Sequence, residues 1–162
     1  MNLFAFFDQH GIRYERHDHP AVYTVEEAKR LVPPLPGAKT KNLFLRDKKG
    51  DRHILVVVPH EKSVDLKSFA SVLGSKKLAL ASPDRLKTHL DLEPGAVSIL
   101  GIVNDRHRAV EVVVDRAVWD QETWQCHPLV NTSTVLISRS DIERLLKITG
   151  HTAQVKDVPA RQ

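Results

Sequence analysis

The chain has 162 residues, with 24 Lys and Arg against 20 Asp and Glu, and so a formal net charge of +4. This length fits a single domain over residues 1–162, and 41% hydrophobic with 27% charged residues excludes a disordered chain. The single cysteine, Cys126, excludes an internal disulfide, and no apolar run reaches the roughly 20 residues that cross a bilayer. Residues 1–8 lack the basic segment of a signal peptide, so we expect a cytoplasmic protein without membrane contact.

Capping residues and glycines mark the ends of the predicted helices. A Ser, Thr or Asp before the first turn accepts hydrogen bonds from free amides, and a glycine after the last turn allows the left-handed conformation that ends a helix. Thr24 and Glu27 form a capping box, and Ser138 and Gly150 bracket the last predicted helix. In chain order, helices are predicted over residues 3–10, 25–31, 66–73, 83–90 and 139–149.

Strands are predicted from runs rich in β-branched residues. In the run from His53 to Val58, residues 54–58 are apolar at successive positions, which is typical of a central strand covered on both faces. In chain order, strands are predicted over 14–17, 43–45, 53–58, 77–81, 97–103, 110–114 and 134–137, with a proline-rich loop over 32–37 and a polar, frayed tail from about 152. Helices and strands alternate without a βαβ repeat, so we expect a mixed-sheet α+β (mixed α/β) domain.

The familiar catalytic motifs do not occur in this sequence. There is no G-x-S-x-G, P-loop or G-x-G-x-x-G. Cys126 and His127 are adjacent on an extended segment and would point to opposite faces, which favours a structural cysteine over a thiol nucleophile. The histidines show no metal-ligand spacing and are expected to be solvated surface residues: His17, His19, His53, His60, His89, His107, His127 and His151.

Two segments carry more polar chemistry than a structural role requires. Lys41 and Asn42 stand at the mouth of a predicted strand, where a lysine that loses solvent could hold a phosphate or an oxyanion. A solvated lysine at a strand start is the simpler alternative, and composition alone favours it. Residues 127–134 place His, Asn, Thr and Ser on a segment bent by proline, which could bind a small ligand or form an ordinary turn.

These segments resemble a known family. The strings Thr-Lys-Asn-Leu-Phe-Leu at 40–45, Pro-Gly-Ala-Val-Ser at 94–98, and His-Pro-Leu-Val-Asn-Thr at 127–132 are similar to those of the YbaK/ProX family of aminoacyl-tRNA editing deacylases. Within it, the chain most resembles the free-standing Ala-tRNA(Pro) deacylases called ProXp-ala or PrdX-like. The resemblance implies a YbaK-like single domain with a mixed, mostly antiparallel central sheet of about six or more strands, flanked by helices.

The resemblance also implies site residues. It assigns a catalytic role to Lys41, Gly95 and Gly101, with the Gly95 to Gly101 loop supplying backbone amides to the ester carbonyl. Ile99 departs from the family, which often has proline there. The substrate-binding residues implied are Thr24, Asn42, Ser98, His127, Asn131 and Thr132.

The expected function is therefore trans-editing, in which the ester of mischarged tRNA is hydrolysed. Ala-tRNA(Pro) is the expected substrate, prolyl-tRNA synthetase a further partner, and water attack is assisted by the substrate's own hydroxyl, without metal or cofactor. An alternative is a non-catalytic nucleic-acid-binding or regulatory module, which a pI near 9.3 and the basic hairpin turn at 46–52 would suit. A third hypothesis is a metal hydrolase, which a chelator would inactivate.

Overall fold

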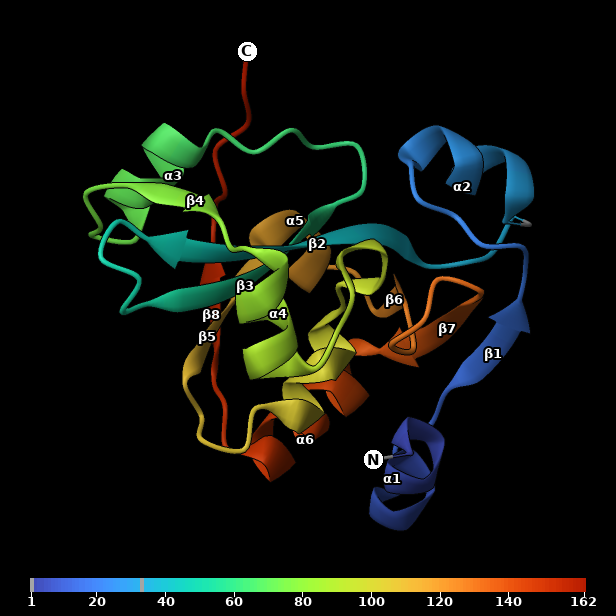
Figure 1. The fold of residues 1–162 in the computed structure, drawn as a ribbon. Coiled ribbons are helices and arrows are strands. Elements are labelled where there is room, and N and C mark those ends of the chain that lie inside the picture. Colours follow the sequence, from blue (N-terminus) through green and yellow to red (C-terminus); the bar gives the residue numbers. More distant parts are fainter. Residues whose placement is uncertain (1, 33) are drawn as a thin grey trace.

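An eight-stranded mixed sheet forms the frame of the computed structural model, which describes residues 2–32 and 34–162. The strands lie in the order β1-β7-β6-β2-β3-β5-β8, and β4 pairs with β2 (Figure 1). Four of the seven neighbouring pairs are antiparallel, which confirms the expected sheet. The strands are β1 Glu15–Asp18, β2 Ala38–Asp47, β3 His53–Pro59, β4 Leu78–Leu80, β5 Val110–Asp115, β6 Thr123–Cys126, β7 Ser133–Ser138 and β8 Ala153–Lys156.

Helices cover both faces of the sheet. They are α1 Leu3–His10, α2 Val25–Leu31, α3 Leu66–Val72, α4 Pro83–Leu90, α5 Arg116–Trp119 and α6 Arg139–Thr149, with 3-10 turns η1 Pro94–Ala96 and η2 Ile99–Asn104. The expected caps are present: the side chains of Thr24, Asp65, Ser82 and Ser138 each accept from an amide three residues on. None of the helices described here is long and apolar enough to cross a membrane.

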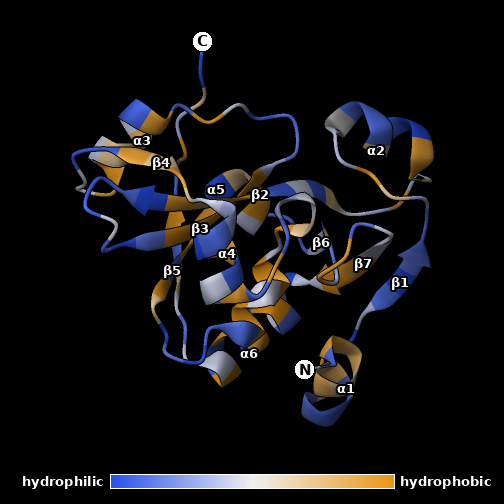
Figure 2. Ribbon diagram, viewed as in Figure 1, coloured by the Kyte–Doolittle hydropathy of each residue, from blue (hydrophilic) through white to orange (hydrophobic). Residues whose placement is uncertain are grey.

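Strand β3 separates the two halves of the hydrophobic core. Its six residues from His53 to Val58 are all buried, as predicted for a central strand. Leu55 and Val57 face the larger cluster with α1, α4 and α6, whereas Ile54 and Val56 face the smaller one with α3. In Figure 2 the apolar residues gather in the middle of the sheet, and the surrounding helices carry polar residues on their outer sides.

Three predicted features differ from the structure. Residues 97–103, expected as a strand, contain the turn η2, because the Ser98 hydroxyl caps the Leu100 amide and starts a helical turn. Strand β6 was not predicted, since Thr-Trp-Gln-Cys has a weak strand pattern. The expected polar tail instead forms β8, which pairs in parallel with β5. Residue 33, within the predicted proline-rich loop, is outside the part of the chain described.

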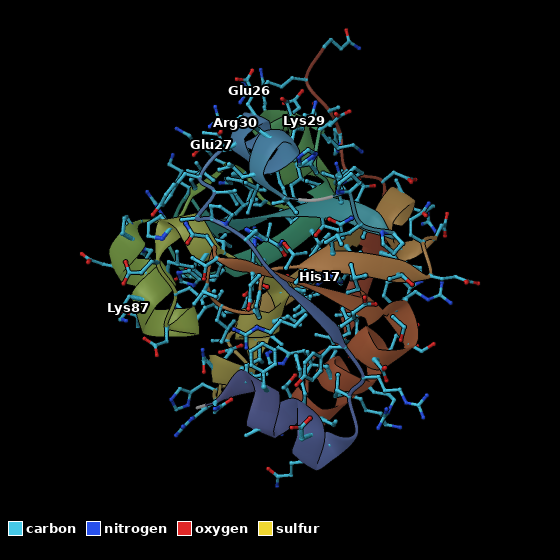
Figure 3. The ribbon with its side chains drawn as sticks, turned by 90° about the vertical axis from the view of Figure 1, so that its right-hand side faces the viewer. His17, Glu26, Glu27, Lys29, Arg30 and Lys87 are labelled. Carbon is cyan, nitrogen blue, oxygen red and sulfur yellow. The ribbon has the colours of Figure 1, made fainter. Side chains whose placement is uncertain are left out.

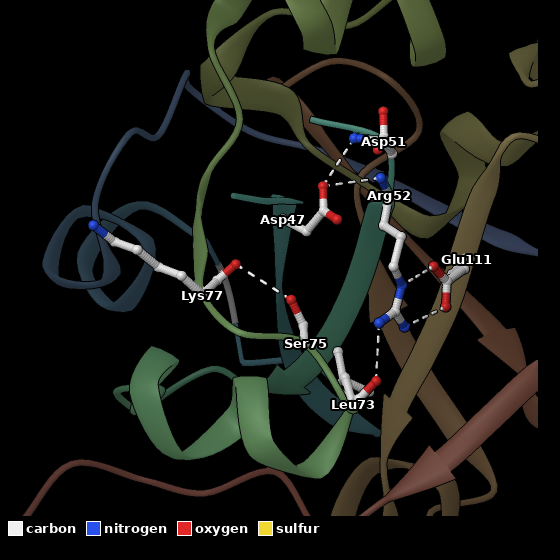
Figure 4. Close-up of polar contacts among 7 residues, drawn as sticks. All are labelled: Asp47, Asp51, Arg52, Leu73, Ser75, Lys77 and Glu111. Carbon is white, nitrogen blue, oxygen red and sulfur yellow. Dashed lines mark hydrogen bonds and ion pairs between the residues drawn. The ribbon is translucent and has the colours of Figure 1, made fainter. Parts of the chain in front are cut away.

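An arginine clamp secures the hairpin of β2 and β3. Arg52 donates from Nε and one terminal nitrogen to both carboxylate oxygens of Glu111, at 2.8 Å each, and from the other to the Leu73 carbonyl (Figure 4). Asp47 accepts from the amides of Asp51 and Arg52 and closes the turn. Arg52 is therefore engaged within the fold, whereas Lys48 and Lys49 of the same turn are exposed.

A buried ion pair joins the sheet to the last residues of the structure. Lys62 Nζ lies 2.6 Å from Asp115 Oδ2 and also donates to the Val158 carbonyl at 2.8 Å. The Asp115 side chain is 3% exposed and the Lys62 side chain 22%. A β-bridge between Val64 and Ala160 extends this contact, so residues 158–161 are held against the loop that follows β3.

Candidate active site

A cavity of about 240 Å³ lies where α2, β2, β6 and the turn η1 meet. Five of the sequence-predicted site residues line it, and Tyr23, Thr40, His60, Gln125 and Cys126 join them. The outer face of α2 carries charged side chains that project away from the body (Figure 3), whereas Ala28 faces the cavity. The predicted residues brought together here are Thr24, Lys41, Asn42, Gly95 and His127.

Lys41 and Asn42 enter the cavity from β2. Burial lowers the pKa of Lys41 below its ordinary value, and the nearby Arg161 charge adds to the effect. Asn42 Oδ1 accepts a hydrogen bond from the Ile99 amide at 2.9 Å. A proline at position 99 would have no N–H for this bond. Ile99, which stands where the family often has proline, therefore fixes the orientation of the Asn42 amide. The Asn42 Nδ2 group is then left free to donate a hydrogen bond.

The turn η1 presents backbone amides to the cavity. Gly95 and Val97 both line it, and their amides have no hydrogen-bond acceptor among the residues described. The amides of Ala96, Ile99 and Leu100 are already bonded to Glu93, Asn42 and Ser98. Free amides beside a desolvated cation form the kind of arrangement that stabilises an oxyanion.

The structure places Gly101 and Ser98 away from the cavity. Gly101 is buried, its amide donates to the Ser98 carbonyl at 3.0 Å, and a Cβ on it would lie 2.6 Å from Leu92 Cδ1. Ser98 is fully buried and its hydroxyl caps η2. Of the loop 95–101, which was expected to supply backbone amides, only Gly95 and Val97 therefore remain candidates. Gly101 allows close packing of the core instead.

Exchanging each glycine for alanine separates these two roles. We expect Gly101→Ala to lower the free energy of unfolding by about 1–3 kcal/mol, because the added methyl overpacks the core against Leu92. Gly95→Ala meets the Tyr23 ring at 3.1 Å, but that residue is 70% exposed and can yield. Urea unfolding of both variants measures the difference, and equal losses would contradict this assignment.

The His127 loop is held by hydrogen bonds to the segment before α2. Asn131 Nδ2 donates to the Val22 carbonyl at 3.1 Å, and the Thr132 carbonyl accepts from the His19 amide at 2.9 Å. Neither Asn131 nor Thr132 lines the cavity, so both act on the position of the loop. Leu129 has a φ of 68°, a left-handed conformation that is uncommon for a branched residue.

The imidazoles and the thiol of the site are uncharged near pH 7. Burial lowers the pKa of His127, and a hydrogen bond to the Ser133 backbone opposes the shift. Burial likewise lowers the pKa of His60, while the pKa of the Cys126 thiol is raised to about 12 by burial. The cavity lining contains Lys39 and Lys41 but no carboxylate, so its charge is positive.

Sequence reasoning missed His60 and misplaced several other histidines. His53 and His60 are 5% and 9% exposed, and the His151 side chain is buried and hydrogen-bonded to Asp105 Oδ2 at 2.8 Å, although all three were expected at the surface. Only the apolar run before His60 could have signalled its burial. No group of three His, Cys, Asp or Glu able to hold a metal is found in the part of the chain described.

The buried histidines predict acid sensitivity. Burial lowers the folded-state pKa of His53, His60 and His127 below 6.5. The unfolded chain therefore binds protons first, so the stabilisation is complete above pH 6.5 and is lost as the pH falls through the folded values. Urea unfolding should show a decline in stability as the pH falls below 6.5, and the decline should be smaller in His53→Gln. A flat profile there would contradict this.

The fold and the cavity define a mixed-sheet domain whose cavity is lined by two lysines and by the residues of a backbone turn. The chain belongs to the aminoacyl-tRNA editing domain family, whose sequence model matches residues 19–145. It is 40% identical to the prolyl-tRNA editing protein ProX of Acetoanaerobium sticklandii, over 93% of this chain and 92% of that protein.

Further relatives and solved structures agree with this assignment. The chain is 39% identical to prolyl-tRNA synthetase associated domain-containing protein 1 of Danio rerio, over 83% of this chain and 74% of that protein. A crystal structure described as a candidate trans-editing enzyme for prolyl tRNA synthetase has a TM-score of 0.73 at 18% identity, covering 99% of this chain and 96% of that one. At this identity the likeness concerns the fold alone.

Proposed function

We propose that the chain is a trans-editing deacylase that hydrolyses the ester of mischarged tRNA, with Ala-tRNA(Pro) as its substrate. The observation that carries the proposal is the meeting of Lys41 with the free amides of Gly95 and Val97 in one cavity. The names of the relatives, which refer to prolyl-tRNA editing and to prolyl-tRNA synthetase, support the choice of tRNA. A cytoplasmic location belongs to the same proposal.

An aminoacyl ester is already activated, so its hydrolysis needs a placed water and a stabilised tetrahedral oxyanion. In the proposed mechanism the amides of Gly95 and Val97 hold the oxyanion, and Lys41 binds the terminal nucleotide through its phosphate. Asn42 Nδ2 and His127 orient the aminoacyl group, and the vicinal ribose hydroxyl helps to activate the water. The water adds to the carbonyl carbon, and the ester oxygen leaves with a proton as the ribose hydroxyl.

Selection between amino acids is steric in this proposal. A synthetase site built for proline cannot strongly reject the smaller alanine, because one methylene is worth only about 1–3 kcal/mol. In this proposal the cavity described above admits small aminoacyl groups and excludes proline, and so corrects the synthetase's error. Prolyl-tRNA synthetase, which releases the substrate, is the proposed partner.

Deacylation of a panel of labelled tRNAs tests the proposal. We expect the protein to release the label from Ala-tRNA(Pro) much faster than from Pro-tRNA(Pro), with Ser-tRNA(Pro) and Cys-tRNA(Pro) setting the upper size. Equal loss of label with and without the protein would overturn the proposed function. Salt-dependent binding of duplex nucleic acid without deacylation would favour a binding module instead.

A further inference from the structure

His60 is a buried cavity residue that the proposed mechanism leaves unused. It follows the last residue of β3, and its amide donates to the Lys39 carbonyl at 3.0 Å, which fixes it beside β2. The residue is 9% exposed and lines the cavity, yet its Nε2 has no hydrogen-bond partner among the residues described. A buried polar nitrogen without a partner is costly, so such groups usually serve a ligand or a water.

The imidazole of His60 is uncharged near neutral pH. Burial lowers its pKa most, Lys39 comes next, and Lys29 and Lys41 act in the same direction, while Glu61 opposes them. A neutral imidazole has one donor nitrogen and one acceptor nitrogen. Because χ2 of histidine is broad and roughly two-fold, either ring edge can be turned toward the cavity.

Few ionisable groups in the cavity can accept a hydrogen bond in this way. No Asp or Glu lines it, its lysines are donors, and the Cys126 thiol has a pKa of about 12. The neutral imidazoles of His60 and His127, together with the 70% exposed phenol of Tyr23, are the ionisable side chains that remain. The two imidazoles come from different segments: the His60 amide is bonded to β2 at Lys39, and His127 follows β6, the strand that pairs with β2 there.

His60 lies beside Lys39, because its amide is bonded to the Lys39 carbonyl, and this position indicates which part of the substrate it contacts. Lys39 and Lys41 are the cations that line the cavity. In the proposed function Lys41 binds the phosphate of the terminal nucleotide, and the ribose lies directly next to that phosphate. We propose that His60 binds the terminal ribose by accepting a hydrogen bond from the free hydroxyl beside the ester. This inference rests on the proposed function and adds to it the residue that holds this hydroxyl.

Binding of two unreactive analogues tests the contact without any need for turnover. The first is adenosine 5′-phosphate with an alanyl amide in place of the 3′-ester, and the second is the same compound without its 2′-hydroxyl. Calorimetry with the wild-type protein should show the second to bind about three- to tenfold more weakly, as expected for one hydrogen bond. In His60→Ala the two analogues should bind alike, whereas the exposed control His107→Ala should behave as wild type.

A hydroxyl effect that persists undiminished in His60→Ala would overturn the inference, as would the absence of any hydroxyl effect in the wild-type protein. Nitrogen NMR of the wild-type imidazole provides a test that does not depend on a variant's folding. The His60 resonances should move with the first analogue and far less with the second, and equal movement would count against the contact. Failure of the proposed function is distinct, because then the wild-type protein hydrolyses no tRNA of the panel.

Discussion

Replacing Lys41 by alanine is expected to lower kcat/KM for Ala-tRNA(Pro) about 100-fold or more. Lys41 lines the cavity from β2, and no carboxylate lines the same cavity among the residues described. In the proposed mechanism Lys41 binds the terminal phosphate, and truncating one partner of a desolvated charge pair typically costs about 2–5 kcal/mol, a factor of roughly 30 to several thousand. Because the side chain is only partly buried, the free energy of unfolding should change little, and urea unfolding checks this.

The pH profile provides a second readout for Lys41. Its pKa is lowered by burial, and the active form is the charged one, so activity should fall as the pH rises through a value below 10.5. Spontaneous ester hydrolysis, measured without protein, is subtracted. Lys147→Ala, an exposed lysine on α6, is the matched control and should retain full activity. Full activity of Lys41→Ala would remove this residue from the mechanism.

Replacing Asp115 by alanine is expected to lower the free energy of unfolding by about 3 kcal/mol. The change leaves the Lys62 ammonium, with its side chain 22% exposed, without its 2.6 Å partner. Removing one member of a buried ion pair costs about 3–5 kcal/mol, and partial exposure places this pair at the lower end. The α5 helix also loses its cap, since Asp115 accepts from the Ala117 amide.

A double-mutant cycle separates the ion pair from the cap. Lys62→Met combined with Asp115→Ala should lose less stability than the sum of the two single changes, because no unpaired charge remains. Urea unfolding of the four proteins gives the coupling. Additive losses would show that the pair contributes nothing beyond packing.

Local signals predicted α1, α2, α3, α4 and α6 because each of these helices carries its own ends, whereas the four-residue helix α5 was not predicted. Asp65 before α3, Pro83 at the start of α4, and Gly150 after α6 determine boundaries without reference to the rest of the fold. Strand β3 was equally clear, since six successive buried residues suit only a two-sided strand. These predictions depend on neighbours in sequence, which a single chain shows directly.

The errors arose where distant residues decide the conformation. The apolar run at 97–103 could form a strand or a helical turn, and contacts of Ile99 with Asn42 and of Leu100 with Ser98 select the turn. Within the site, motif strings found Lys41, Asn42, Gly95 and His127 but placed Gly101 with them. Its packing against Leu92, nine residues earlier in the chain, is visible only in three dimensions.

The placement of β8 has a consequence for how the chain folds during synthesis. Strand β5 needs β3 on one side and β8 on the other, and residues 153–156 are made about 40 residues after β5 itself. At the opposite edge, β1 has to wait for β7, which lies more than 100 residues later. Unpaired strand edges promote association, so the growing chain exposes both margins of its sheet until translation has passed residue 156.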